Sequence, residues 1–155
     1  MTTAPVLVAD LLRHDLIVRL RVTGHSMTPF IRTGDVLTVE PLRDRRLSRG
    51  DVILHAPGRR LVAHRIVGWR GALVRSRGDI APGEDPPLLP GDVLGIVTAV
   101  ERDGRSVRLG PRPLRAAIAW LSRTGLLRGL ACSRERFLRS GRIPPDPPAR
   151  VSPSG

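Results

Sequence analysis

The strongest constraint on the fold of this 155-residue chain is a series of seven short apolar runs between about residues 17 and 109. Each run is rich in valine, leucine and isoleucine, and glycine, proline, aspartate or serine separates it from the next. Runs of this kind are typical of β-strands, and Asp103-Gly104 between the last two runs favours a hairpin turn. Fifteen prolines and sixteen glycines also favour many short elements. The sequence therefore predicts a mainly β domain of antiparallel sheets.

Helical spacing of apolar residues occurs only outside this region. Near the N-terminus it predicts a short amphipathic helix over Val6–Leu16. The same spacing recurs over residues 114–121, so we expect a basic helical tail over residues 111–141, interrupted near Gly125. Residues 142–155 are rich in proline and serine and have no periodicity, which predicts a disordered end.

The positive charge of the chain is concentrated in this tail. All 26 basic residues are arginines, 14 residues are acidic, and the net charge is +12. Residues 111–155 hold nine of the arginines and only two acidic residues. Such a tail favours peripheral contact with an anionic membrane, which co-sedimentation with liposomes would test. Aromatic residues are 3% of the chain and tyrosine is absent, which argues against nucleic acid recognised by base stacking.

We expect residues 1–110, which contain the first predicted helix and the seven apolar runs, to form the main domain. No run approaches the roughly 18 apolar residues of a membrane-spanning helix. Charged residues interrupt the first apolar stretch, so we expect neither a secretory signal nor a location outside the cytoplasm. The single cysteine, Cys132, cannot form an internal disulfide or a thiolate metal site. We identify no pattern that predicts a cofactor or a metal.

One twelve-residue window carries the strongest functional signal. Residues 24–35 read GHSMTPFIRTGD, which fits the pattern G-x-S-M-x-P-x-x-x-x-G-D at all six fixed positions. Glycine before the serine permits close approach of a substrate backbone, and the proline restricts the turn that presents the hydroxyl. This pattern resembles the signature of the serine peptidase family that holds signal peptidases and LexA-like self-cleaving proteins. The resemblance covers about residues 20–110 and implies that Ser26 is the nucleophile.

A serine hydroxyl needs a neighbouring base to accept its proton. Members of this family use lysine or histidine, and a chain without lysine cannot build a Ser-Lys dyad. Because imidazole titrates near neutral pH, the main candidates are His14, His25, His55 and His64. His64 lies in LVAHRIV, which resembles the histidine-base branch found in archaeal, sporulation-type and endoplasmic-reticulum signal peptidases. The resemblance implies that His64, 38 residues after Ser26, is the base. We expect His25 to contact the loop or substrate, and His14 and His55 to be structural.

The resemblance also implies a supporting aspartate. The tripeptide RGD, which ends in Asp79, is followed six residues later by Asp85, as in the third sequence element of the family. By resemblance Asp85 orients His64 and Asp79 supports the pocket. Both aspartates lie in one loop, so the sequence leaves open which of them orients the imidazole. Glu84 is a neighbouring alternative, and Asp85 before a proline also fits an ordinary turn residue.

Taken together, the resemblance implies coiled antiparallel sheets of the signal peptidase type and a serine endopeptidase that cleaves signal or leader peptides. It further implies a peptide or protein substrate bound as an extended strand, with small residues near the cleaved bond. Two departures stand out. Gly24 replaces the side-chain hydroxyl that several signal peptidases use as an oxyanion donor, and the hydrophobic anchor of membrane-bound relatives is missing. Losing one oxyanion donor costs about 10²–10³-fold in rate.

Two alternatives keep the same fold. A LexA-like regulatory protein cleaves itself and carries a DNA-binding domain, but only about 20 residues precede the motif and the lysine of such proteins is missing. A catalytically inactive module would only bind peptides. The joint presence of Ser26, His64, Asp79 and Asp85 argues against that second alternative.

Overall fold

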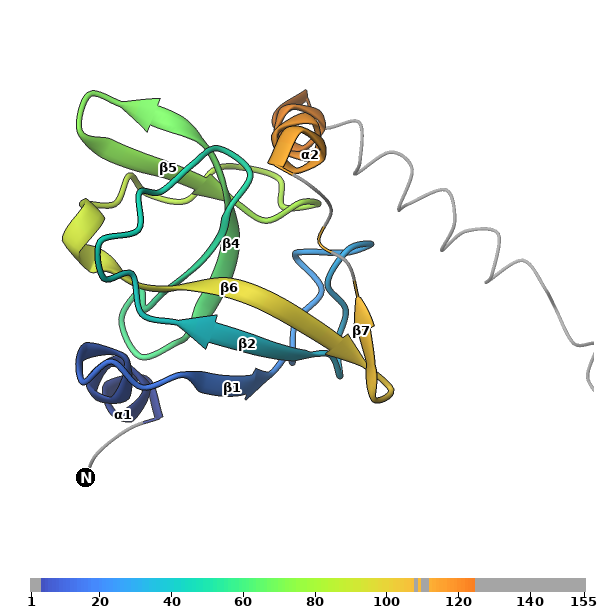
Figure 1. Ribbon diagram of the computed structural model, residues 1–155. Helices are drawn as coiled ribbons and strands as arrows, with labels where there is room; N and C mark the ends of the chain where they lie inside the picture. The colour runs from blue at the N-terminus through green and yellow to red at the C-terminus, as the bar shows by residue number, and fades with distance from the viewer. Residues whose placement is uncertain (1–3, 108, 110–111, 125–155) are drawn as a thin grey trace, which may run out of the picture.

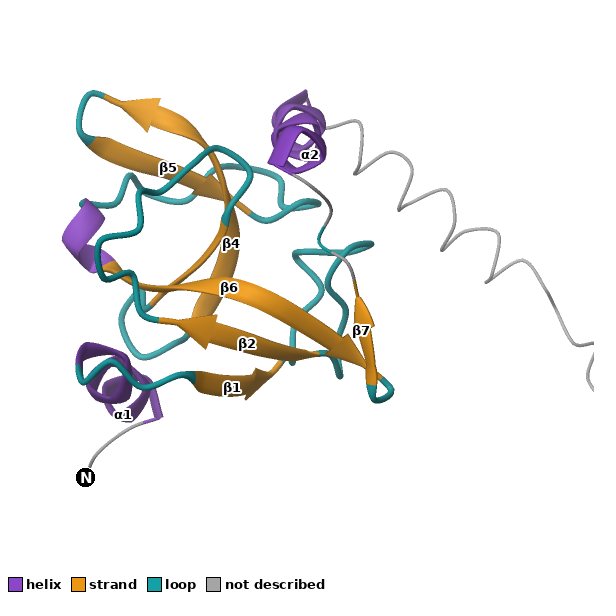
Figure 2. Ribbon diagram, in the orientation of Figure 1, coloured by secondary structure: helices purple, strands orange, loops and turns teal. Residues whose placement is uncertain are grey.

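The computed structural model describes residues 4–107, 109 and 112–124 (Figure 1). Along this part of the chain run seven strands, two α-helices and a short 3₁₀ helix, Pro90–Asp92 (Figure 2). Several predictions fall on other residues. The interruption near Gly125, the rest of the predicted tail, Cys132 and the predicted disordered end at 142–155 lie outside the described residues.

The seven predicted strands are present, and every pairing between them is antiparallel. The strands are β1 Val18–Arg21, β2 Val36–Glu40, β3 Val52–His55, β4 Val62–Arg70, β5 Leu73–Arg77, β6 Val93–Arg102 and β7 Arg105–Val107. Their order in the sheet is β1-β2-β6-β3-β4-β5, with β7 paired to β6. The long strand β6 pairs with β2, β3 and β7, and the sheet curls around it (Figure 1). The predicted mainly β, antiparallel class is confirmed.

Two kinds of turn connect several of these strands. Asp103 and Gly104 form the tight turn between β6 and β7, with φ of 50° and 73°. Positive φ at both central positions is what a type I′ hairpin turn requires, so the predicted hairpin is confirmed. The other kind contains a Gly-Asp dipeptide and occurs three times, at residues 34–35, 50–51 and 91–92. In each, the aspartate carboxylate accepts a hydrogen bond from the backbone N–H group three residues before it. The pairs are Arg32 with Asp35 at 2.8 Å, Ser48 with Asp51 at 2.9 Å, and Leu89 with Asp92 at 3.2 Å.

The N-terminal helix α1 extends over Ala4–Arg13, slightly earlier than the predicted Val6–Leu16. It ends where it does because Asp15 adopts φ of 60°, outside the helical region. Its inward face consists of Val8, Ala9 and Leu12. The second helix, α2, covers Arg112–Thr124 within the predicted helical tail. It lies against β4 and buries Ile118 and Ala119 (Figure 1).

The sheet has apolar residues on both faces. The larger cluster combines α1 with one face of the sheet and includes Val8, Leu12, Met27, Ile31, Leu37, Val39, Leu54, Val97 and Val100. A smaller cluster on the other face contains Ile53, Ile66, Val74 and Val93. Neighbouring residues of β3 belong to different clusters because side chains alternate along a strand. Met27 and Ile31 attach the loop that carries Ser26 to the larger cluster.

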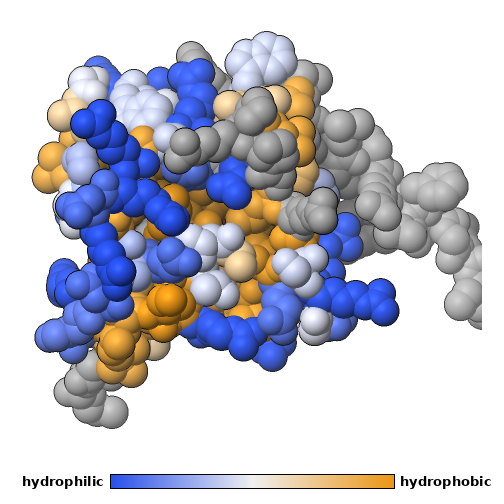
Figure 3. Space-filling view, in the orientation of Figure 1, coloured by the Kyte–Doolittle hydropathy of each residue, from blue (hydrophilic) through white to orange (hydrophobic). Residues whose placement is uncertain are grey.

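Part of the apolar surface stays exposed near α1. Figure 3 shows hydrophobic atoms gathered at the end of the molecule where this helix lies. The exposed side chains are Val6, Leu7, Leu16 and Ile17, each at least half exposed. Among the described helices, none combines the length and the apolar character needed to cross a membrane.

Candidate active site

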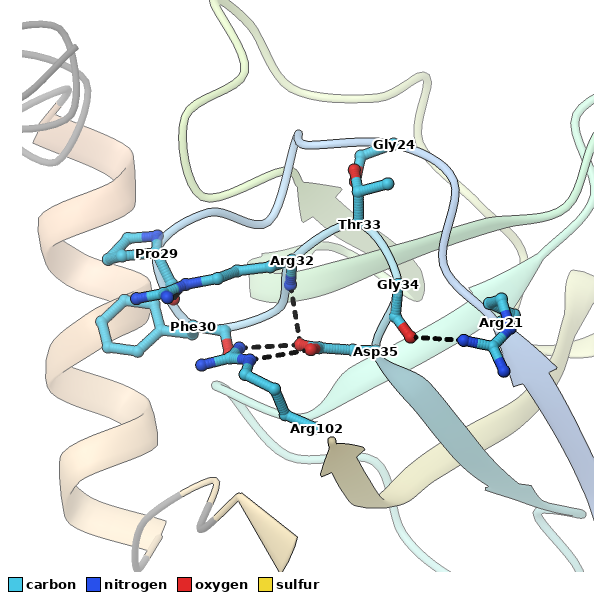
Figure 4. A network of polar contacts seen from close by, with 9 residues as sticks. All are labelled: Arg21, Gly24, Pro29, Phe30, Arg32, Thr33, Gly34, Asp35 and Arg102. Atoms are coloured by element: carbon cyan, nitrogen blue, oxygen red, sulfur yellow. Dashed lines mark hydrogen bonds and ion pairs between the residues drawn. The ribbon is translucent and has the colours of Figure 1, made fainter. Parts of the chain in front are cut away.

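Buried side chains on both sides of Ser26 hold the loop between β1 and β2. Met27 and Ile31 are buried, and the Ile31 N–H donates to the Met27 carbonyl at 3.0 Å. The Thr33 hydroxyl donates to the Gly24 carbonyl at 3.1 Å (Figure 4). The methionine of the motif is therefore a core residue, and the loop is closed by its own polar groups.

Asp35, the last residue of the motif, anchors the far end of this loop. Its carboxylate accepts two hydrogen bonds from the Arg102 guanidinium, at 2.8 and 2.7 Å, and one from the Arg32 N–H (Figure 4). Arg102 also donates to the Phe30 carbonyl at 3.2 Å. Burial alone raises the pKa of Asp35, but the hydrogen bonds from Arg102 and Arg32 and the charge of Arg102 lower the pKa below its usual value. The ionised Asp35 thus links the loop to β6 through its salt bridge with Arg102.

Ser26, His64 and Asp85 form one continuous hydrogen-bonded chain. The Ser26 Oγ lies 2.9 Å from the His64 Nε2. On the other side of the ring, Nδ1 lies 2.9 and 2.7 Å from the two Asp85 oxygens. An ionised carboxylate can only accept, so Nδ1 carries the proton and Nε2 is left free to accept the Ser26 proton. His64 lies on β4 opposite Ile53, and its side chain is 11% exposed.

A second donor fixes the Asp85 carboxylate. The Ser76 hydroxyl donates to it at 2.6 Å, and the Asp85 N–H donates to the Ser76 carbonyl at 2.9 Å. Burial raises the pKa of Asp85, but the hydrogen bonds from His64 and Ser76 outweigh burial, and the pKa of Asp85 is lowered. Ser76 was not predicted from the sequence. Ser76 stands at the end of an apolar run, where a serine is a common residue, and the neighbouring sequence does not indicate a contact with Asp85.

The two other acidic candidates have different partners. Asp79 forms a paired contact with the Arg65 guanidinium, with both distances at 2.8 Å, and both side chains are almost completely buried. Arg65 also donates to the Gly50 carbonyl at 3.0 Å. Glu84 pairs with Arg75 at 2.6 and 2.7 Å. The structure therefore brings Asp85 to His64, whereas Asp79 ties β4 to the loop after β5.

Gly78 allows Ser26 and His64 to lie close together. A Cβ atom at this position would lie 2.8 Å from the Ser26 Cβ and 3.0 Å from the His64 Nε2. Real Cβ atoms essentially never come within 2.8 Å of another side chain's carbon, so a residue other than glycine requires a shift of Ser26 or its neighbours. The Ile80 N–H donates to the Ser26 carbonyl at 2.9 Å and joins the same two segments.

The Ser26 hydroxyl opens into a groove of about 780 Å³. One side comes from β1 and the residues that follow it, 20–24, and the other from residues 59–64 at the start of β4. Its floor is apolar and includes Met27, Ile31, Leu37 and Leu54. Each wall has a strand edge without a partner in the described part of the chain. Among the described strands, β1 pairs only with β2, so its other edge is free. The pairing of β4 with β5 begins at Arg65, so the preceding residues of β4 are free on that side. The groove can therefore take an extended peptide by strand addition.

The position two residues before Ser26 offers no side-chain hydroxyl, but the backbone N–H group of Ser26 is free within the described part of the chain. Gly24 has no side chain, and its carbonyl accepts the hydrogen bond from Thr33. The Ser26 N–H donates to no group of the described residues, so it is available to an oxygen bound beside Oγ. Such an N–H group is suited to stabilise a developing oxyanion.

The remaining histidines form no hydrogen bond to Ser26, His64 or Asp85 among the described residues. His14 is exposed beyond the end of α1, and its Nδ1 lies 2.9 Å from the Asp10 carbonyl oxygen. His25 is exposed beside Ser26. His55 is buried on β3, with Nε2 3.8 Å from an Asp85 oxygen. Burial lowers the pKa of His55, and the charge of Asp85 only partly opposes this effect, so the ring is neutral at neutral pH.

Comparisons of the chain with models of protein families, with characterised proteins and with solved structures find no match. The resemblance to signal peptidases therefore rests on the motif residues of this chain.

Proposed function

We propose that the protein is a serine endopeptidase of the signal peptidase type, with Ser26 as nucleophile, His64 as general base and Asp85 as the group that orients His64. The hydrogen-bonded order Ser26–His64–Asp85 carries this proposal. It combines a weak nucleophile, a base within reach of its proton and a carboxylate that selects the tautomer of the base. Ser-His-Asp hydrolases combine these three roles in acyl transfer.

In the proposed reaction His64 Nε2 accepts the Ser26 proton while Oγ attacks the carbonyl carbon of the substrate. The Ser26 N–H stabilises the oxyanion that forms. The imidazolium, paired with Asp85, then gives its proton to the leaving amine as the peptide bond breaks. A water molecule repeats the sequence on the acyl-enzyme, with His64 again taking and returning one proton, and releases the new carboxylate.

The substrate of this proposal is an extended peptide that enters the groove as an added strand. The free edges of β1 and of the start of β4 offer backbone donors and acceptors to such a peptide. The apolar floor favours uncharged side chains over charged ones at the positions that point inward. Cleavage near small residues, as in signal and leader peptides, is the specificity that the family resemblance implies.

A fluorophosphonate probe tests the proposal before any substrate is identified, because it labels activated serines. We expect the wild type to be labelled at Ser26, and both Ser26→Ala and His64→Ala to lose labelling while they unfold at the wild-type temperature. His14→Ala is the matched control and should be labelled like the wild type. Cleavage of a peptide library should likewise be retained by the wild type and His14→Ala and lost in Ser26→Ala and His64→Ala. A folded wild type that neither reacts with the probe nor cleaves any peptide would favour the inactive peptide-binding module.

A further inference from the structure

His55 is a buried histidine without a hydrogen-bond partner. Its side chain is 3% exposed, and neither ring nitrogen makes a hydrogen bond with the described residues. Leaving a buried polar group unpaired destabilises the folded state, so an unpaired buried imidazole points to a further role for His55. Its ring lies beside that of His64, with centroids 6.2 Å apart, and its Nε2 points toward Asp85 at 3.8 Å.

These three residues offer ligand atoms for one metal ion. One ring nitrogen each of His55 and His64 and one oxygen of Asp85 lie within 4.8 Å of one another. Zinc binds imidazole nitrogen at about 2.0–2.1 Å and carboxylate oxygen at about 2.0–2.2 Å, which places tetrahedral ligands roughly 3.3 Å apart. The separation of 2.7 Å between His64 Nδ1 and Asp85 must open slightly, and that of 3.8 Å between His55 Nε2 and Asp85 must close slightly. The two imidazole nitrogens lie within 4.8 Å of each other, so binding draws the two rings together. Two imidazoles and a carboxylate are a usual donor set for Zn²⁺.

We propose that His55, His64 and Asp85 form a Zn²⁺ site that switches the peptidase off. Coordination through Nδ1 requires that this atom carry no proton. The Nδ1 proton is released to solvent and another is taken up at Nε2, so that the single N–H proton of the neutral ring sits on the atom that faces Ser26. In this tautomer Nε2 can donate but cannot accept the Ser26 proton, so the nucleophile is not activated. The inhibitory effect rests on the proposed function, but zinc binding itself does not.

Zinc binding is measured first in Ser26→Ala, which keeps all three ligands and has no nucleophile. Competition with a chromophoric chelator gives the affinity, and Co²⁺ in place of Zn²⁺ gives the visible absorption of a four-coordinate site. We expect one tight site in Ser26→Ala. Adding His55→Phe should weaken it by more than about 10-fold, since even the loss of an outer-shell partner costs about 10–100-fold. Adding His14→Asn, which removes an exposed histidine near Asp10, should leave the affinity unchanged. Equal affinity with and without His55 would overturn the site.

Inhibition is measured separately, as the zinc concentration that halves fluorophosphonate labelling of Ser26, with each variant normalised to its own zinc-free rate. The His55→Phe variant should need more than about 10 times as much zinc as the wild type, and a chelator should restore labelling of the wild type. Zinc bound at His55 without any effect on labelling would overturn the switch. Zinc binding in a wild type that never reacts with the probe would leave the site standing and contradict the proposed peptidase.

Discussion

At the scale of single residues, two aspartates six positions apart have unlike surroundings. Asp85 is partly buried and accepts hydrogen bonds from His64 and Ser76. Asp79 is fully buried, and its pairing with Arg65 joins β4 to the loop that follows β5. One carboxylate therefore faces the groove and the other supports the fold, although both lie in one loop.

Replacing the two aspartates should separate activity from stability. Asp85→Asn should keep its fold and lose about 10⁴-fold in the rate of peptide cleavage, because an amide no longer selects the His64 tautomer. Asp79→Ala should instead lose about 3–5 kcal/mol of unfolding free energy, because it leaves Arg65 buried and unpaired. Urea unfolding and cleavage rates measured on the same samples distinguish the two effects. The reverse pattern would contradict the separate roles of these two carboxylates.

The Asp35 carboxylate should make stability depend on pH. Its pKa is lower in the folded chain than in the unfolded chain, so its stabilising effect is full above the unfolded value of about 3.9 and is lost as the pH falls through the folded value. At pH 7 we expect Asp35→Asn to cost about 1.5–3 kcal/mol, typical of hydrogen bonds to a charged group. The difference from wild type in urea unfolding should shrink below about pH 4. Asp44→Asn, at an exposed position, is the control, and a difference independent of pH would contradict an ionised Asp35 tie.

At the scale of elements, the loop from β5 to β6 completes the site. It carries both aspartates, and Gly78 at its start lies against Ser26 and His64. In the sequence this glycine stands out only as part of a motif. In the fold it is the point where two segments approach so closely that no side chain fits.

Gly78→Ala should therefore impair catalysis more than folding. The added methyl group must push Ser26 or His64 away, and a displacement of about 1 Å costs roughly 10²-fold in rate. Gly83→Ala in the same loop is the matched control, since no atom lies within 4 Å of the added carbon. Labelling by fluorophosphonate and thermal unfolding should both be followed. A Gly78→Ala variant with wild-type labelling would show that this contact is not needed.

At the scale of the whole molecule, the sheet and the helices present two different surfaces. The groove follows the free edges of β1 and β4, whereas α2 lies against β4 with an outer side that carries Leu114 and Trp120, 50% and 58% exposed. Ile118 and Ala119 face inward. The predicted contact of the basic tail with an anionic membrane would place Trp120 at the interface.

This contact should be visible in the fluorescence of Trp120. In a Trp69→Phe background, Trp120 is the single tryptophan of the chain. We expect its emission to shift to shorter wavelength with phosphatidylserine vesicles and to return in high salt, because screening weakens the attraction of arginines to the lipid charge. Phosphatidylcholine vesicles are the control. An unchanged spectrum with both lipids would contradict the membrane contact.

The sequence by itself determined the features that depend on near neighbours in the chain. Strand-forming runs, the turn at Asp103-Gly104 and the first helix follow from local spacing and from backbone preferences. The serine motif could likewise be recognised from the sequence, because its residues lie within one loop. The contacts of Asp85, Asp79, His55 and Gly78 were decided only by the tertiary structure. Their partners are distant in sequence, and strand register and sheet curvature set which side chains meet.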